Sequence, residues 1–143
     1  MKILVLNGPN INMLGIREPG IYGSRTFQDL LVLLHSLETE YGVQIVQVQS
    51  NHEGVLVDEI QNAYGQFDGI VINPAAYTHT SIAILDALKA VNLPAVEVHI
   101  SNLQDREDFR RISYAGLACE KTVAGLGLDG YRQAVEYLIR RVQ

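Results

Sequence analysis

The sequence predicts an α/β protein in which five parallel strands lie between two layers of helices, a three-layer α/β/α sandwich. Short runs of apolar and β-branched residues alternate with longer segments whose apolar side chains recur every three or four residues. The first pattern is typical of buried strands and the second of amphipathic helices. Consecutive parallel strands need a crossover, which a helix usually supplies. Five strand–helix units in 143 residues fit the flavodoxin-like form of this sandwich.

The expected strands are short and the expected helices are longer. The strands are residues 3–6, 43–48, 69–72, 95–100 and 122–124. The helices are about residues 27–37, 55–64, 81–91, 105–113 and 131–142. Thr26 and Asp29 can form a variant capping box at the start of the first helix. Three helices are followed by residues that commonly end a helix, namely Gly42, Gly65 and Asn92.

The composition favours a globular protein and argues against several classes of partner. The formal charge is -5 and the 11 Lys and Arg residues are not gathered in one run, whereas a nucleic-acid partner requires a basic face. Cys119 is the only cysteine, which excludes an intrachain disulfide and fits a reducing compartment such as the cytoplasm. No apolar run reaches the roughly 18 residues of a membrane span. We expect one domain over residues 1–143.

Familiar cofactor motifs are missing from the sequence. There is no GxGxxG segment and no Walker A lysine, so a dinucleotide or P-loop nucleotide is not expected. His52 and Glu53 lack the second histidine of a zinc-binding HExxH motif. A phospho-receiver domain needs acidic residues after its first strand, where this chain has Asn7 and Asn10. A flavin-binding module is the remaining alternative of this fold, but the loop after the first strand lacks Ser and Thr for a phosphate.

The fourth predicted strand carries two ionisable residues where apolar ones are expected. A central parallel strand is buried on both faces, yet this one contains Glu97 and His99. Residues two apart project from the same face, so the carboxylate can orient the imidazole and stabilise its charged form. The alternative is a buried pair that only satisfies itself. Because ligands of parallel sheets bind beyond the carboxyl ends of the strands, we favour an acid–base role.

The segment from Asn73 to Ser81 gathers hydrogen-bonding side chains between the third strand and a helix. A helix N-terminus favours anionic ligands, so these residues are candidates for ligand binding. Ser81 could equally be only the N-cap, and His79 alone could be a solvent-exposed loop histidine. The nearby Asn73 and the strand-four pair favour a binding role for His79.

Residues 12–25 form a long connection that contains Arg17 and Tyr22. Loops of this length in compact domains are commonly functional lids or disordered. A cation close to a phenol favours the tyrosinate, and lowering its pKa from about 10 to about 7.5 requires about 3.4 kcal/mol. The alternative, which composition alone favours, is that Tyr22 only packs the loop onto the domain.

Arg106 and Arg110 are four residues apart in a segment expected to be helical. On a helix they would share a face and could clamp an anionic substrate. Alternatively they form a solvated helix face paired with Glu107 and Asp108.

Six sequence segments together resemble the type II 3-dehydroquinate dehydratases. In chain order they are NGPNINMLGIREPGIYG, QSNHEG, INPAAYTHTSIAILDAL, EVHISN, REDFR and AGLGLDGY. The resemblance extends from the first strand to the last helix. It implies a lyase that removes water from 3-dehydroquinate by anti elimination through an enolate, without metal or organic cofactor, in aromatic amino acid biosynthesis or quinate breakdown.

The resemblance also implies a catalytic role for five residues. Tyr22 would be the base that removes the C2 proton, and Arg17 the cation that lowers its pKa. His99 would protonate the departing C1 hydroxyl, and Glu97 would hold His99. Asn10 would hold a water or polar contact at the developing enolate oxygen.

Further residues would bind the substrate by the same resemblance. Asn73 and the backbone around Ile100 and Ser101 would hold its carboxylate, and His79 and Arg110 would bind ring hydroxyls. A non-catalytic subunit is disfavoured because every expected residue type is present.

Two implied residues depend on surroundings that the sequence leaves open. Arg106 would come from a lid over the site, and Asp86 would reach the pocket of a neighbouring subunit in a dodecamer built from trimers. The chain departs from the common family wording at Leu103-Gln104-Asp105, where a His-Ala-like pair is expected.

Overall fold

The computed structural model describes residues 1–16, 20 and 25–143 and contains a five-stranded parallel sheet with the strand order β2-β1-β3-β4-β5. The strands are β1 (Lys2–Asn7), β2 (Gln44–Gln49), β3 (Gly69–Asn73), β4 (Ala95–His99) and β5 (Lys121–Ala124). This order is that of flavodoxin-like folds, so the predicted fold class is confirmed. The predicted bounds of each strand lie within one residue of the observed bounds.

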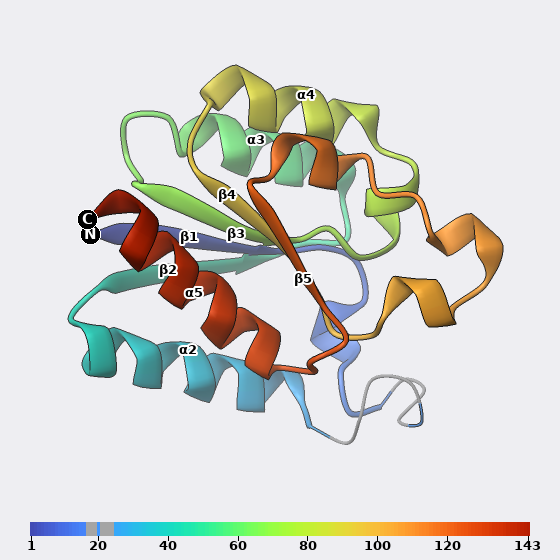
Figure 1. Ribbon diagram of the computed structural model, residues 1–143, viewed down its shortest axis with the longest axis horizontal. Helices are drawn as coiled ribbons and strands as arrows, with labels where there is room; N and C mark the ends of the chain where they lie inside the picture. The colour runs from blue at the N-terminus through green and yellow to red at the C-terminus, as the bar shows by residue number, and fades with distance from the viewer. Residues whose placement is uncertain (17–19, 21–24) are drawn as a thin grey trace.

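In the described part of the chain, four helices cover the two faces of the sheet (Figure 1). Helices α3 (Glu53–Asn62) and α4 (Ile82–Val91) lie on one face, and α2 (Phe27–Tyr41) and α5 (Asp129–Val142) lie on the other. Alternate strand residues point to opposite faces, which produces two hydrophobic clusters, one under each helix pair. Within the described ranges, none of these helices has the length and apolarity that a bilayer crossing requires.

Helix α2 begins where the capping box was predicted. The Thr26 hydroxyl accepts a hydrogen bond from the Asp29 backbone N–H (3.1 Å), and the Asp29 carboxylate accepts one from the Thr26 N–H (2.8 Å). The helix ends at Gly42, whose φ of 65° is left-handed and favours glycine.

The helix predicted for residues 105–113 is not present. The connection from β4 to β5 consists of three short 3-10 turns, η3 (Leu103–Asp105), η4 (Asp108–Arg110) and η5 (Ala115–Ala118). The apolar side chains of the predicted helix, Phe109 and Ile112, are 65% and 56% exposed. A helix is held in a protein mainly by burial of one face, and this segment has no face to bury.

The carboxyl ends of β1 and β3 lie side by side, because Asn7 pairs with Asn73 in the register of the sheet. At this position the strand order switches direction, and ligands of such sheets bind in the crevice there. Gly8 permits the close approach of the two loops, since a Cβ at this position would lie 2.4 Å from the Pro74 carbonyl oxygen.

Candidate active site

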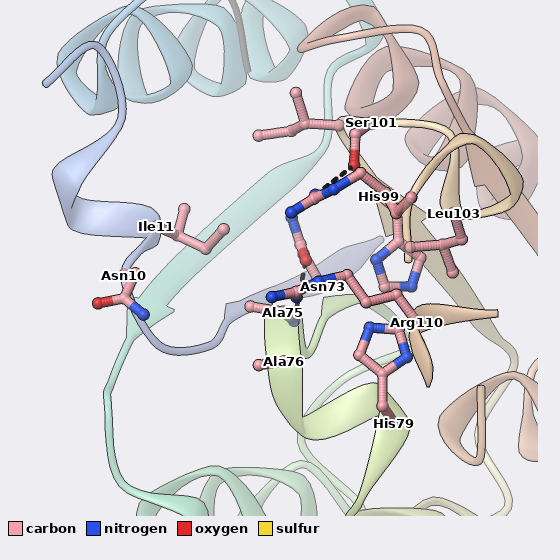
Figure 2. Close-up of a pocket in the computed structure, with 12 residues that line it drawn as sticks. Asn10, Ile11, Asn73, Ala75, Ala76, His79, His99, Ser101, Leu103 and Arg110 are labelled. Atoms are coloured by element: carbon pink, nitrogen blue, oxygen red, sulfur yellow. Dashed lines mark hydrogen bonds between the residues drawn. The ribbon is translucent and has the colours of Figure 1, made fainter. Parts of the chain in front are cut away.

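A cleft with about 500 Å³ of empty space, part of it open to solvent, lies over the carboxyl ends of β1, β3 and β4. Asn10 and Ile11 border one side, and His79, His99 and Arg110 border the other (Figure 2). Eight residues predicted from the sequence line it: Asn10, Asn73, His79, His99, Ile100, Ser101, Arg106 and Arg110.

Glu97 and His99 form a buried pair at the end of β4. Their side chains are on the same face of the strand, as predicted, and the residues are 0% and 5% exposed. His99 Nε2 is 3.0 Å from Glu97 Oε2. His99 Nε2 has no hydrogen-bond partner of acceptable geometry among the described residues, so this contact is a close approach of the ring nitrogen to the carboxylate. Because Glu97 lies behind His99 and only His99 lines the cleft, the carboxylate can act on a ligand only through the imidazole.

Three hydroxyl groups surround the Glu97 carboxylate, and the sequence did not reveal them. Thr78 of η2 (Ala75–His79) and Ser113 donate to Oε2, and Thr122 of β5 donates to Oε1 over 3.0 Å. Gly116 leaves room for this arrangement, because a Cβ there would lie 2.9 Å from Glu97 Oε1. The carboxylate therefore has donors on both oxygens besides its contact with His99.

The pKa of Glu97 shows the balance of these contacts. Burial alone would raise it, but His99 and the hydroxyls of Ser113 and Thr78 outweigh burial and hold the pKa at about 2. Glu97 is therefore ionised at neutral pH.

His79 is oriented by the loop that follows η4. Its Nδ1 lies 2.7 Å from the backbone carbonyl oxygen of Ile112, and since a carbonyl only accepts, Nδ1 carries the proton. Burial lowers the pKa of His79, which favours the neutral ring. In that state Nε2 is an acceptor, and it suits a ligand hydroxyl that donates.

Asn10 occupies a strained turn that other side chains support. Its φ is 70°, in the left-handed region that asparagine tolerates better than most residues. The Asn10 N–H donates to Asn51 Oδ1 over 3.1 Å, and the amide of Gln49 also donates to this oxygen over 3.2 Å. Residues 49–51 belong to the QSNHEG segment, so this segment fixes the turn that carries Asn10.

Arg106 and Arg110 supply positive charge to the cleft although they are not on one helix. Arg106 follows η3 with an extended backbone, and its Nη1 donates to Ser101 Oγ over 3.2 Å. Arg110 ends η4 and pairs with Glu107. Since Arg106 also lines the cleft, two guanidinium groups face one cavity and could bind an anionic ligand. Leu103, which belongs to the Leu103-Gln104-Asp105 segment that differs from the usual family sequence, lines the same cavity.

Besides Glu97, three predicted residues are not found among the described residues that line the cleft. Arg17 and Tyr22 lie outside the described residues. Asp86 is exposed on α4 and does not border the cleft of its own chain. Among the residues that the structure describes, no group of three or more His, Cys, Asp or Glu side chains could hold a metal ion.

Residues 1–139 match the sequence model of the family described as dehydroquinase class II. The chain belongs to this family. Among proteins named 3-dehydroquinate dehydratase, one from Corynebacterium glutamicum (strain R) is 54% identical over 137 residues, which cover 96% of this chain and 94% of the relative. One from Geotalea daltonii is 53% identical over 143 residues, which cover 100% and 99%. The type II dehydroquinase of Butyrivibrio crossotus has a similar structure, with a TM-score of 0.96, 48% identity and 97% of each chain covered. The resemblance inferred from six segments is therefore confirmed.

Proposed function

We propose that the chain converts 3-dehydroquinate to 3-dehydroshikimate and water, as a hydro-lyase of the shikimate pathway. The observation that supports this most directly is the buried Glu97–His99 pair at the edge of a cleft that also contains Arg106 and Arg110. The substrate is a carboxylate with several hydroxyls, and the cleft offers guanidinium groups, amides and an imidazole to such a molecule. Proton transfer by His99 needs no further cofactor.

The reaction proceeds in two steps through an enolate. A base removes the C2 proton, and the C–H electron pair forms the enolate whose charge rests on the C3 oxygen. Re-formation of the C3 carbonyl then creates the C1–C2 double bond and expels the C1 hydroxyl. His99 gives its proton to this hydroxyl, which leaves as water, and Glu97 stabilises the imidazolium before transfer.

The roles of the remaining residues follow from family membership and location. We assign the base to Tyr22 and its activation to Arg17, both outside the described residues. Asn10 stands where a water or polar contact could stabilise the enolate oxygen.

The remaining cleft residues fix the substrate. Asn73 and the backbone at Ile100 and Ser101 bind the carboxylate, and His79 and Arg110 bind ring hydroxyls. These five residues line one cleft, which supports a shared role in binding.

We further propose that residues 1–143 form a single catalytic domain. Twelve copies would assemble in the cytoplasm as a dodecamer built from trimers. Exposure of Asp86 on α4, away from its own cleft, supports its placement in a neighbour's site, because the side chain is accessible to a second chain. Arg106 would form part of the lid in each subunit.

Enone formation tests the proposed reaction. The product is an enone and the substrate is not, so purified protein mixed with 3-dehydroquinate should produce an increase in ultraviolet absorbance. A flavin module of the same fold would instead carry a visible chromophore. If enone absorbance rises no faster with the protein than without it, the proposal is contradicted.

A further inference from the structure

The Gly-Leu-Asp-Gly-Tyr segment at the start of α5 is part of the family resemblance, yet the proposed reaction gives it no role. Its tyrosine, Tyr131, is fully buried in the first turn of the helix. The Tyr131 hydroxyl lies between the side chains of Asn7 and Asn73, the last residues of β1 and β3. It therefore reaches the part of the sheet above which the cleft lies, although it does not line the cleft.

The direction of each hydrogen bond in this cluster follows from the groups involved. Tyr131 donates its single proton to Asn7 Oδ1 over 2.6 Å, so it accepts from Asn73 Nδ2 over 2.9 Å. Asn7 Nδ2 donates to Gln47 Oε1 over 3.0 Å. The Ala75 N–H donates to Asn73 Oδ1 over 3.1 Å. Burial raises the pKa of Tyr131, so its hydroxyl stays protonated and remains a donor.

Both ends of the Asn73 amide are therefore held. Its oxygen faces the Ala75 N–H, and one hydrogen of its nitrogen faces the Tyr131 hydroxyl. The second hydrogen of Nδ2 has no hydrogen-bond partner among the described residues. Because Asn73 lines the cleft, this hydrogen is available to an oxygen of a bound molecule.

We propose that Tyr131 is a positioning residue for substrate binding, whose hydroxyl fixes the Asn73 amide so that an N–H donor serves the substrate carboxylate. The inference rests on the proposed function, in which Asn73 binds that carboxylate. A rotated amide would place its oxygen against the anion and repel it. Without the phenol hydroxyl, only the Ala75 N–H opposes this rotation, so substrate affinity should fall while proton transfer at His99 continues.

The test compares Tyr131→Phe, Asn73→Ala and the double variant in steady-state kinetics with 3-dehydroquinate. Tyr131→Phe should raise KM about 5- to 20-fold, the loss of roughly one hydrogen bond to a charged group, and change kcat less than about threefold. If Tyr131 acts through Asn73, adding Tyr131→Phe to Asn73→Ala should raise KM by less than about twofold. An unchanged KM in Tyr131→Phe would overturn the proposal. So would an equal fold-increase in KM when Tyr131→Phe is introduced into the wild type and into Asn73→Ala.

Two further variants separate positioning from a general effect on folding. Tyr137 lies on the same helix and donates to Glu120 at the surface over 2.9 Å, so Tyr137→Phe should leave KM unchanged. A KM increase there equal to that of Tyr131→Phe would contradict a specific role. Should Tyr131→Phe fail to fold, Gln47→Met on the edge strand removes only the far end of the cluster. It should raise KM about twofold, and no increase would count against the proposal.

Failure of this inference and failure of the proposed function are distinguishable. A wild-type protein that forms no enone would contradict the function itself. An active wild type with an unaffected Tyr131→Phe variant would contradict only the role of Tyr131.

Discussion

Thr122 and Glu97 lie directly opposite each other on neighbouring strands, and the Thr122 hydroxyl donates a 3.0 Å hydrogen bond to Glu97 Oε1. Thr78 and Ser113 donate to the other carboxylate oxygen. Glu97 would therefore keep these hydrogen-bond donors in the proposed step in which His99 gives up its proton. The carboxylate can then stay ionised while the charge of His99 changes.

Thr122→Val should weaken this support while preserving side-chain shape. We expect the pKa of Glu97 to rise, the free energy of unfolding at pH 7 to fall by about 1 kcal/mol, and kcat to fall less than about tenfold. Urea unfolding and enone kinetics measure these changes. Thr122→Ser keeps the hydroxyl and is the matched control. If Thr122→Val and Thr122→Ser change the free energy of unfolding and kcat equally, the hydrogen bond has no role.

Glu97 should make stability depend on acid pH in a defined direction. Its pKa of about 2 in the folded chain is below the ordinary 4.5, so its contribution is present above pH 4.5 and is lost as pH falls toward 2. The shift corresponds to about 3 kcal/mol. Urea unfolding at pH values from 7 to 2 measures the free energy of unfolding of the wild type and of Glu97→Gln. The difference between the two free energies should become smaller as the pH falls. A difference independent of pH would contradict this account.

His99→Ala should reduce kcat by about 100- to 10,000-fold, because general acid catalysis of the departing hydroxyl is lost. The control is His35→Ala on α2, because the His35 side chain is 82% exposed and does not line the cleft. Enone kinetics give kcat for both variants, and kcat of His35→Ala should equal that of the wild type. A His99→Ala rate within a few fold of wild type would assign the proton donor to another group.

Arg110→Ala should raise KM about 10-fold or more, since it removes a cation that lines the cleft. Arg111→Ala is the matched control, because Arg111 is adjacent, pairs with Asp108 over 3.4 Å and does not line the cleft. Comparison of the two KM values with 3-dehydroquinate checks this. If the two variants behave alike, the position of Arg110 in the cleft has no bearing on substrate binding.

Tyr22→Phe should abolish turnover and leave substrate affinity nearly unchanged, because the phenol is proposed to act on a proton rather than to bind. Arg17→Ala should cause a similar loss of kcat, as the phenol pKa would return toward about 10. Titration calorimetry and enone kinetics separate binding from turnover. A normal rate in Tyr22→Phe would remove it as the base.

The sequence predicted those parts of the molecule that depend on regular patterns. The strands follow from uninterrupted apolar runs, and Glu97 and His99 were found because ionisable residues interrupt one of them. The helix predicted over residues 105–113 was wrong, because the apolar residues that suggested it, Phe109 and Ile112, are exposed and bury no helix face.

The hydroxyls around Glu97 had no such signal. Thr78, Ser113 and Thr122 come from three separate segments, and isolated hydroxyl residues are common in any sequence. Only the tertiary fold brings them to one carboxylate. Tyr131 belongs to a segment that resembles the family, but its contacts with Asn7 and Asn73 depend on the packing of α5 against the sheet.

The alternation of side chains across the sheet separates two sets of interactions. Glu97, His99 and their hydroxyl partners lie toward α3 and α4, while Asn73 and Tyr131 lie toward α2 and α5. No hydrogen bond joins the two sets among the described residues, so we expect the free-energy effects of mutations on the two sides to be nearly additive. Natural selection or laboratory evolution can therefore tune ligand affinity from one layer and acid strength from the other, with little interference between the two traits.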